Sequence, residues 1–368
     1  MKVRTVTFFY RFKDFFIGND FLRFLSNAKS VEEDFSKAGF KPQTVRVTTN
    51  ISDFISSERD VKNSLILEDI CEDFGFTFVN YGKFNKNIRF LPLLFDRTKN
   101  VSASSEINCS SEIDFNMLER ASSVIPDISD LGKNKNFNYS VSMNIREHTP
   151  FYPASYASKE GFSIGFENGD LLQKSFFNAK SFTTAGKILL ETLNKNYIPV
   201  EERAKMLSKK HKIAYLGIDT SFAPGLNKDD SVMKSFDILK KNTGANYLAI
   251  AGLITDAAKR AEVKRVGYCG LMLPVCEDIY LAKEADERKV NIERLLFLST
   301  VCGCGLDTIP VSGNIGKKRI SAILLDTATL SKKLQKPLSV RLLPVKGIKK
   351  GERTKFSSKY LVDSKAME

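Results

Sequence analysis

Thr44-Val-Arg-Val-Thr-Thr-Asn50 is typical of a β-strand, because β-branched residues fill the stretch and the turn-forming Asn50 ends it. A similar stretch lies earlier, at residues 3–10, and between the two the apolar residues Phe21, Phe24 and Leu25 recur at helical spacing. Two strands joined by a helix are typical of a parallel pair. The opening of the chain therefore predicts α/β architecture.

The same alternation continues along most of the chain. Further strands are expected at 76–81, 138–145, 212–219 and 338–343, and further helices at 61–74, 229–239, 291–300 and 320–327, with a long one from Ser181. Residues 95–136 are rich in Ser, Asn, Asp and Lys, so we expect a partly irregular insertion there, with a short helix at 115–121.

The composition is that of an ordinary globular protein. Hydrophobic residues make up 42% of the 368 residues and charged residues 27%, which excludes disordered and low-complexity architecture. No stretch approaches the roughly 20 apolar residues that cross a bilayer, and the first ten residues alternate like a strand and not like a signal peptide. We therefore expect a cytoplasmic protein without a membrane partner.

The net charge of +13 is concentrated near the C-terminus, where residues 313–368 carry 14 Lys and Arg against 4 Asp and Glu. This basic region could bind nucleic acid or another anionic partner, or it could be a solvated, lysine-rich surface. No nucleic-acid-binding motif accompanies it, which favours the solvated surface. We expect only non-specific binding to nucleic acid, in the range of about 10⁻⁴ to 10⁻⁶ M.

The cysteines and histidines limit metal chemistry. Six cysteines do not make a disulfide scaffold in a chain of this length, and the spacing C-x6-C-x25-C-x-C from Cys269 to Cys304 matches no common zinc or iron–sulfur site. Two histidines exclude a histidine-rich metal site. A divalent metal stays possible through carboxylates, and neither its identity nor any other cofactor follows from the sequence.

Five segments place polar residues at strand ends or turns, where α/β folds hold their sites. The candidate substrate-binding residues in them are Arg46, Thr48, Asn50, Asp219, Ser221, Gly303, Gly305, Thr308 and Arg341. The candidate catalytic residues are Cys302, Glu277, Asp278 and Asp307. Arg341 lies in an otherwise apolar strand, and a buried arginine needs either an internal carboxylate or a ligand anion as its partner.

Each candidate also has a purely structural interpretation. Asp219 could bind a metal, a substrate hydroxyl or a lysine, or could cap its own turn. Glu277 and Asp278 suit acid–base work or a divalent cation, and equally suit the first turn of a helix. Cys302-Gly-Cys-Gly305 could present a reactive thiol, or could be a tight turn with inert thiols.

These segments resemble an uncharacterised, widespread family of archaeal and bacterial proteins, often called PFL-like after pyruvate formate-lyase. The resemblance rests on Arg4-Thr-Val-Thr, 44–50, Phe151-Tyr-Pro-Ala-Ser-Tyr156, 162–167, 219–224, 270–278, 302–308 and Arg341-Leu-Leu-Pro-Val345. It implies one domain over residues 1–368, built as a ten-stranded β/α barrel, and an archaeal-type member. Family genes often neighbour a small amino-acid-sensing regulatory protein, which implies that such a protein is a partner. A homodimer is also expected.

Glycyl-radical chemistry is not expected despite this resemblance. Such enzymes need an Arg-Val-x-Gly-aromatic signature near the C-terminus, and the nearest string here, Arg265-Val-Gly-Tyr268, lacks one residue and lies far from the end. The leading hypothesis is a metabolic enzyme that binds an anionic carboxylate or phosphate substrate in a pocket at the barrel mouth, with Cys302 as a reactive thiol. The alternative is a non-catalytic sensor of a small ligand.

Two geometric expectations follow. Arg46, Asp219 and Asp307 should approach one shared cavity. An arginine should lie within about 6 Å of the Cys302 sulfur, because the C-terminal end of the preceding helix would otherwise oppose formation of a thiolate.

Overall fold

A computed structural model of the protein describes residues 1–132, 134–356 and 358–368. Its strands are β1 (Lys2–Tyr10), β2 (Thr44–Thr49), β3 (Phe78–Lys83), β4 (Val101–Glu106), β5 (Tyr139–Met143), β6 (Gly161–Glu167), β7 (Tyr215–Ala223), β8 (Gly305–Ser312) and β9 (Leu338–Val345). The expected strands at 3–10, 44–49, 76–81, 138–145, 212–219 and 338–343 are confirmed, with shifts of a few residues at their ends.

The nine strands form one mixed sheet in the order β7-β6-β1-β2-β3-β4-β5-β9-β8. Strands β1 to β5 follow one another in parallel, as the alternating pattern predicts. On one flank β6 runs antiparallel to β1 and β7 runs parallel to β6; on the other, β9 runs antiparallel to β5 and β8 runs parallel to β9. The fold is thus mixed α/β, with two outer pairs that run against the central five strands.

The sheet is not closed, so the expected ten-stranded barrel stays a prediction. The two edge strands of the sheet, β7 and β8, nevertheless both contact one further segment of the chain. Ile218 and Phe222 of β7 form parallel bridges to Arg265 and Leu271, and Asp307 of β8 forms a parallel bridge to Pro274. The segment 265–274 therefore contacts both edges without being a continuous strand.

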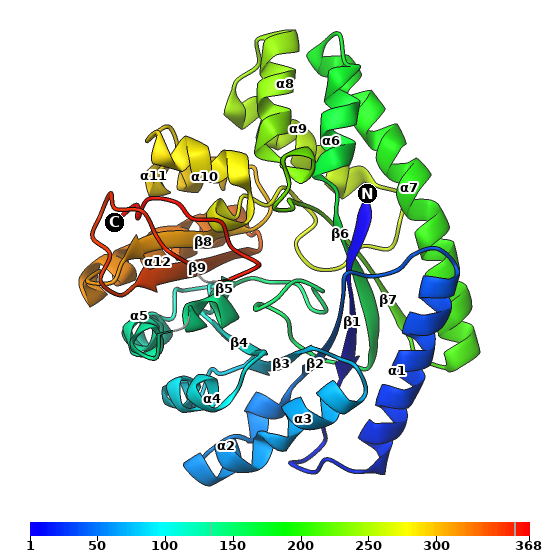
Figure 1. Ribbon diagram of the computed structural model, residues 1–368, viewed down its shortest axis with the longest axis vertical. Coiled ribbons are helices and arrows are strands. Elements are labelled where there is room, and N and C mark those ends of the chain that lie inside the picture. Colours follow the sequence, from blue (N-terminus) through cyan, green and yellow to red (C-terminus); the bar gives the residue numbers. More distant parts are fainter. Residues whose placement is uncertain (133, 357) are drawn as a thin grey trace.

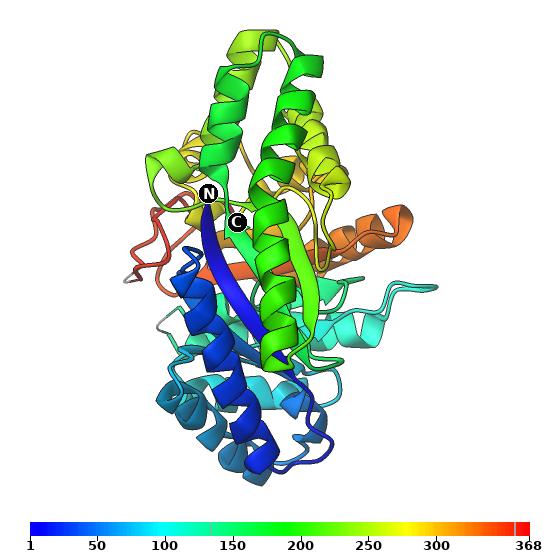
Figure 2. The same ribbon diagram turned by 90° about the vertical axis from the view of Figure 1, so that its right-hand side faces the viewer.

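The helices lie around the outside of the curved sheet (Figure 1). They are α1 (Asn19–Lys37), α2 (Glu58–Ser64), α3 (Ile66–Asp73), α4 (Leu91–Arg97), α5 (Phe115–Asp130), α6 (Gly169–Phe177), α7 (Phe182–His211), α8 (Met233–Thr243), α9 (Tyr247–Arg260), α10 (Ile279–Asp286), α11 (Ile292–Leu298) and α12 (Lys317–Leu334). Figure 2 shows α1 and α7 side by side across the outer face of β1 and β7. Alternate strand residues such as Phe8, Val47 and Val79 are fully buried in the hydrophobic core.

The helix expected at 115–121 is confirmed and continues to Asp130 as α5, but the expectation that 95–136 is an irregular insertion is wrong. Within its described residues lie the end of α4, the whole of β4, α5 and the start of a short 3-10 helix; residue 133 lies outside the described residues. The serines that suggested a loop bond to neighbouring strands: Ser102 Oγ accepts from Asn80, and Ser105 Oγ donates to the carbonyl of Phe84. Small hydroxyl side chains can thus line a buried sheet face when backbone and amide partners satisfy them.

A loop at residues 144–160 enters the space that the strands surround. The side chains of Thr7 and Asn80 donate to its carbonyls at Pro150 and Pro153, at 3.0 and 2.8 Å. Its Tyr152 hydroxyl donates to the carbonyl of Val47 at 2.6 Å. The polar inner face of the sheet is therefore covered by this loop and not by a layer of helices, and the loop forms one wall of the cavity described next.

Candidate functional site

A cavity of about 450 Å³ lies inside the sheet, beside the loop at 144–160. Its charged lining comes from elements distant in sequence: Arg4 of β1, Arg46 of β2, Glu167 of β6, Glu277 of the 3-10 turn Val275–Glu277, Asp307 of β8, Arg341 of β9 and Lys359. Its aromatic lining consists of Phe78, Phe137, Phe151, Tyr152, Tyr268 and Tyr360. The fold thus gathers charged groups from most of the sheet around one space.

Glu277 lies between two arginines. Its Oε1 accepts from Arg341 at 2.6 Å and its Oε2 accepts from Arg4, also at 2.6 Å. Arg341 continues the chain of ion pairs to Asp307, with 2.6 Å between Nε and Oδ1. Burial opposes the charge on Glu277, but Arg341 and Arg4 outweigh it and hold the pKa of this carboxyl below its ordinary value. Arg341 therefore has internal carboxylate partners, one of the two possibilities that its sequence left open.

Arg46 is held differently. Its Nε donates to Thr44 Oγ1 at 3.1 Å, and its guanidinium lies 4.9 Å from the ring centre of Tyr152 and 5.7 Å from that of Phe78. Among the described residues no carboxylate forms an ion pair with it. Burial lowers the pKa of Arg46 to about 10, and the nearby Arg4 acts in the same direction. Arg46 is thus a half-buried cation, still charged at neutral pH, whose neighbours are rings, other arginines and the Glu277 carboxylate, which favours its charge without forming an ion pair with it.

Asp307 reaches the cavity through an irregularity in β8. The register between β8 and β9 shifts between Leu306 and Ile309, and Thr308 has a φ of +44°, which is rare for a β-branched residue. The Thr308 hydroxyl accepts from the backbone N–H of Cys276 at 3.2 Å, which helps to hold this conformation. Burial raises the pKa of the Asp307 carboxyl above its ordinary value, although Arg341 acts against this.

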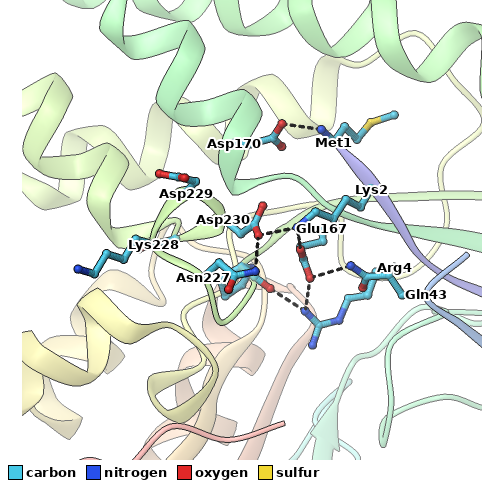
Figure 3. A network of polar contacts seen from close by, with 12 residues as sticks. Met1, Lys2, Arg4, Gln43, Glu167, Asp170, Asn227, Lys228, Asp229 and Asp230 are labelled. Carbon is cyan, nitrogen blue, oxygen red and sulfur yellow. Dashed lines mark hydrogen bonds and ion pairs between the residues drawn. The ribbon is translucent and has the colours of Figure 1, made fainter. Parts of the chain in front are cut away.

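The rim of the cavity near β1 and β6 is a second network of ion pairs (Figure 3). Lys2 Nζ lies 3.0 Å from Glu167 and 2.5 Å from Asp230, and Gln43 donates to Glu167 at 3.3 Å. Arg4 lies 3.9 Å from the same Glu167. Glu167 is therefore already surrounded by donors, and this rim holds the start of β1 against β6 and the loop at 227–230.

One polar atom of the wall has no partner. Ser140 lines the cavity and is 2% exposed, and its Oγ makes no hydrogen bond among the described residues. A buried hydroxyl without a partner is costly and uncommon in a folded protein. This Oγ has almost no accessible surface, so it is a buried group of the wall and not a donor open to the cavity.

Asp219 lies outside the lining of this cavity, although we expected it there with Arg46 and Asp307. It is fully buried and accepts from the hydroxyls of Thr149 and Ser221 and from the backbone N–H groups of Tyr268 and Cys269, at 2.6–3.1 Å. Burial raises the pKa of Asp219. The candidate Ser221 serves the same network. The Asp219 carboxyl therefore links the segment 265–274 to β7 and to the loop at 144–160, which we call the inner loop.

Asp278 also has a structural place. Its carboxylate accepts from Ser231 Oγ and from the first backbone N–H groups of α8, at Val232 and Met233. It accepts as well from the N-terminal N–H groups of α10, so one buried side chain caps two helices. Of the adjacent pair of acids, Glu277 enters the cavity and Asp278 holds the turn.

Cys302 does not line the cavity, whereas Cys304 does. Cys302 is 1% exposed and its sulfur lies 3.6 Å from Ser299 Oγ; the described residues show no ion pair or hydrogen bond between it and an arginine. Burial, together with nearby Cys302 and Asp307, raises the pKa of Cys304 well above its ordinary value. These surroundings favour a neutral Cys304 thiol.

The remaining candidates support the walls. Thr48 Oγ1 lies 2.9 Å from Ser155 Oγ in the inner loop, and Asn50 exchanges hydrogen bonds with the backbone of Phe12. Gly303 packs against Gly270, where an added Cβ would lie 2.6 Å from the Gly270 Cα. Gly305 has a φ of +89° at the start of β8, a conformation that glycine adopts at little cost.

Sequence reasoning did not assign a site role to Arg4, Glu167 or Tyr152. Arg4 gave the same signal as Arg341, a cation within a strand of apolar and β-branched residues. Nothing in the local sequence around Tyr152 indicates that its ring lies against Arg46.

The described residues hold no group of three or more His, Cys, Asp or Glu side chains arranged to bind a metal ion. The carboxylates of the cavity are occupied by arginines instead. Among the helices of the described chain, none has both the length and the apolar character that crossing a bilayer requires.

Comparison with known proteins identifies relatives in bacteria and archaea. The chain is 31% identical over 153 residues to a UPF0210 protein of Pyrobaculum arsenaticum, which covers 40% of this chain and 34% of the relative. It is 24% identical to UPF0210 proteins of Lactobacillus helveticus and Clostridium botulinum, over 74% and 73% of this chain and 64% and 63% of theirs. The chain thus spans less than two thirds of the length of these relatives. A family model described as Uncharacterised ACR (DUF711) matches residues 1–358, and the chain therefore belongs to this family.

Proposed function

We propose that this protein binds a small organic anion, a carboxylate or a phosphate, in the cavity inside its sheet. The observation that carries the proposal is Arg46, a half-buried guanidinium on the cavity wall without a carboxylate partner among the described residues. A buried cation is unfavourable unless it is paired, so an anion in the cavity would complete its surroundings. The planar guanidinium suits the paired oxygens of both kinds of anion.

The other arginines support this assignment by contrast. Arg4 and Arg341 share Glu277, and Arg341 also pairs with Asp307, so neither needs a ligand for charge balance. They still contribute positive potential near Arg46.

The size and lining of the cavity favour a metabolite-sized ligand. A volume of about 450 Å³ lies within the range of roughly 300–1,000 Å³ that is typical of small-molecule sites. The rings around it would contact the apolar body of such a ligand, while Arg46 fixes its anionic end. A reactive thiol is not required for this function, and Asp307, whose pKa burial raises, is the carboxyl group of the cavity most suited to acid–base chemistry.

The segment 265–274 takes the place of a tenth strand in this proposal. Its bridges to β7 and β8 support a barrel of the ten-stranded type that the chain resembles, with the inner loop at 144–160 filling the barrel. Such closure would leave the cavity inside the ring, which is where barrel proteins commonly hold small ligands.

Isothermal titration calorimetry with sulfate, inorganic phosphate and acetate tests the proposal. We expect at least one of these anions to bind the wild-type protein, and Arg46→Met to weaken that binding at least tenfold. The matched control is Arg59→Met, which removes an exposed arginine from α2 and should bind like the wild type. Equal binding by both variants, or no binding of any anion to the wild type, would refute the proposal.

A further inference from the structure

The charged side chains that line the interior of the cavity are equal in number of each sign, although Arg46 itself forms no ion pair among the described residues. Three are cationic and three are anionic: Arg4, Arg46, Arg341, Glu167, Glu277 and Asp307. The remaining cation of the lining, Lys359, is exposed at the surface. A bound anion would therefore add an uncompensated negative charge in a poorly solvated space, which is unfavourable. Uptake of one proton by a wall carboxylate would restore neutrality.

Of the three carboxylates, Asp307 is the one most able to take up that proton. Both oxygens of Glu277 accept from guanidinium groups, so protonation there would break an ion pair. Glu167 accepts from Lys2 and Gln43 and lies near Arg4. Asp307, by contrast, has a single ion pair, through Oδ1 to Arg341, and its Oδ2 takes no part in that pair.

The groups that face Asp307 come from four elements. Arg341 of β9 favours its charged form, whereas Glu277, the Cys304 thiol and the Tyr268 hydroxyl do not. Arg4 and Arg46 lie further along the same wall, around Glu277. Burial is the largest influence and raises the pKa of Asp307, so its protonated form is easier to reach than that of an exposed aspartate.

The backbone next to Asp307 departs from regular strand geometry. The register shift in β8 and the left-handed conformation of Thr308 occur at this point, and such conformations are unfavourable where they are imposed. Irregularities of this kind often direct a side chain toward a site. Here the irregularity accompanies the one acid that β8 contributes to the cavity lining.

We propose that the anion held by Arg46 binds together with one proton, which resides on the Asp307 carboxyl group and is donated from there to the ligand in a hydrogen bond. This inference rests on the proposed function of anion binding. It adds that the ligand class is that of small acids, taken up as anion plus proton. The affinity for such an anion should fall by up to about tenfold per pH unit as the pH rises from the pKa of Asp307 in the free protein to its higher pKa in the complex, and it should level off above that.

Calorimetry with acetate tests the proton uptake, because acetate carries a single negative charge and does not titrate near neutral pH. Titrations at pH 6, 7 and 8, each in two buffers with different heats of ionisation, give the number of protons taken up per acetate bound. We expect close to one proton at the lower pH values, with affinity falling toward pH 8. Binding of acetate without proton uptake and with constant affinity would overturn this inference while leaving the proposed function intact.

Two variants locate the proton. Asp307→Asn offers a permanent N–H donor in place of the protonated carboxyl, so it should bind acetate with little proton uptake and with an affinity that changes less than threefold between pH 6 and 8. Asp229→Asn removes an exposed acid near the rim and should keep the wild-type proton uptake. If Asp307→Asn keeps that uptake as well, the proton resides elsewhere. Should this variant fail to fold, infrared difference spectra of the wild type, with and without isotopically labelled acetate, must show a new protonated carboxyl band that the label does not shift; its absence would contradict the proposal.

Discussion

On the β8–β9 side of the cavity Arg341 lies between two carboxylates, whereas on the β2 side Arg46 lies between two aromatic rings. Both arginines come from strands of apolar and β-branched residues, and both were candidates for holding an anion. The difference is that the chain supplies the partners of one and not of the other. On the β8–β9 side the chain itself supplies the carboxylates that pair with Arg341, and we call this side self-sufficient. On the β2 side a bound anion would supply the partner that Arg46 lacks.

The largest effect is expected from Glu277→Gln. This change removes the charge shared by Arg4 and Arg341, and it leaves buried Arg341 with Asp307 alone and half-buried Arg4 with only the more distant Glu167. Breaking a buried ion pair in this way costs about 3–5 kcal/mol. Urea denaturation should show this loss in the free energy of unfolding, whereas Glu33→Gln, at an exposed glutamate of α1, should change it by less than about 0.5 kcal/mol. A loss below about 1 kcal/mol for Glu277→Gln would mean that the β8–β9 side is not self-sufficient.

A smaller effect is expected from Asp278→Ala, which removes the cap of both α8 and α10. Loss of one cap costs about 0.5–2 kcal/mol, so two caps predict a total of about 1–4 kcal/mol. Anion binding at Arg46 should be unchanged, because Asp278 does not line the cavity. Calorimetry of this variant at a temperature where it is folded separates the two roles; loss of anion binding there would place Asp278 in the site after all.

The pH dependence of stability distinguishes the carboxylates further. The pKa of Glu277 is lowered in the folded protein, so its charge stabilises the fold above its ordinary pKa, and this contribution is lost as the pH falls through the lowered value. We expect Glu277→Gln to reduce the loss of stability between about pH 5 and 3, measured by denaturation at each pH. If the stability of the variant falls over this pH range as steeply as that of the wild type, Arg4 and Arg341 do not lower the pKa of Glu277.

The smallest effect is expected at the thiols. Burial raises the pKa of Cys304, so iodoacetamide should modify neither Cys302 nor Cys304 in the native protein at pH 7, and both after unfolding. Peptide mass spectrometry with Cys302→Ser and Cys304→Ser as references identifies the modified residue. Rapid modification of native Cys302 would restore the hypothesis of a reactive thiol.

Much of the α/β order could be predicted from the sequence because strand and helix periodicity is local. The strand at 44–49 has the predicted ends, and Ser181 caps the long helix that was expected to follow it. The serine-rich β4 was missed because its polar side chains are satisfied by neighbouring strands. A local sequence pattern does not indicate hydrogen-bond partners that come from distant elements of the chain.

The same limit applies to the site. The acids that follow one another at 277 and 278 could not be told apart from the sequence, yet one enters the cavity and the other caps two helices. Asp219 gave a signal like that of Asp307, but the segment 265–274 folds over it and supplies its hydrogen bonds. Which arginine keeps a partner depends on strand order, which residue spacing does not reveal.

The central claim is that Arg46 needs an anion and Arg341 does not. Its most direct measurement is the affinity of the anion that binds the wild type best, determined by calorimetry for Arg46→Met beside the unchanged protein, together with the unfolding free energy of both without the anion. The account predicts an affinity at least tenfold weaker, with the unfolding free energy changed by no more than about 1 kcal/mol. Unchanged affinity, or a loss of stability as large as that of Glu277→Gln, would contradict it.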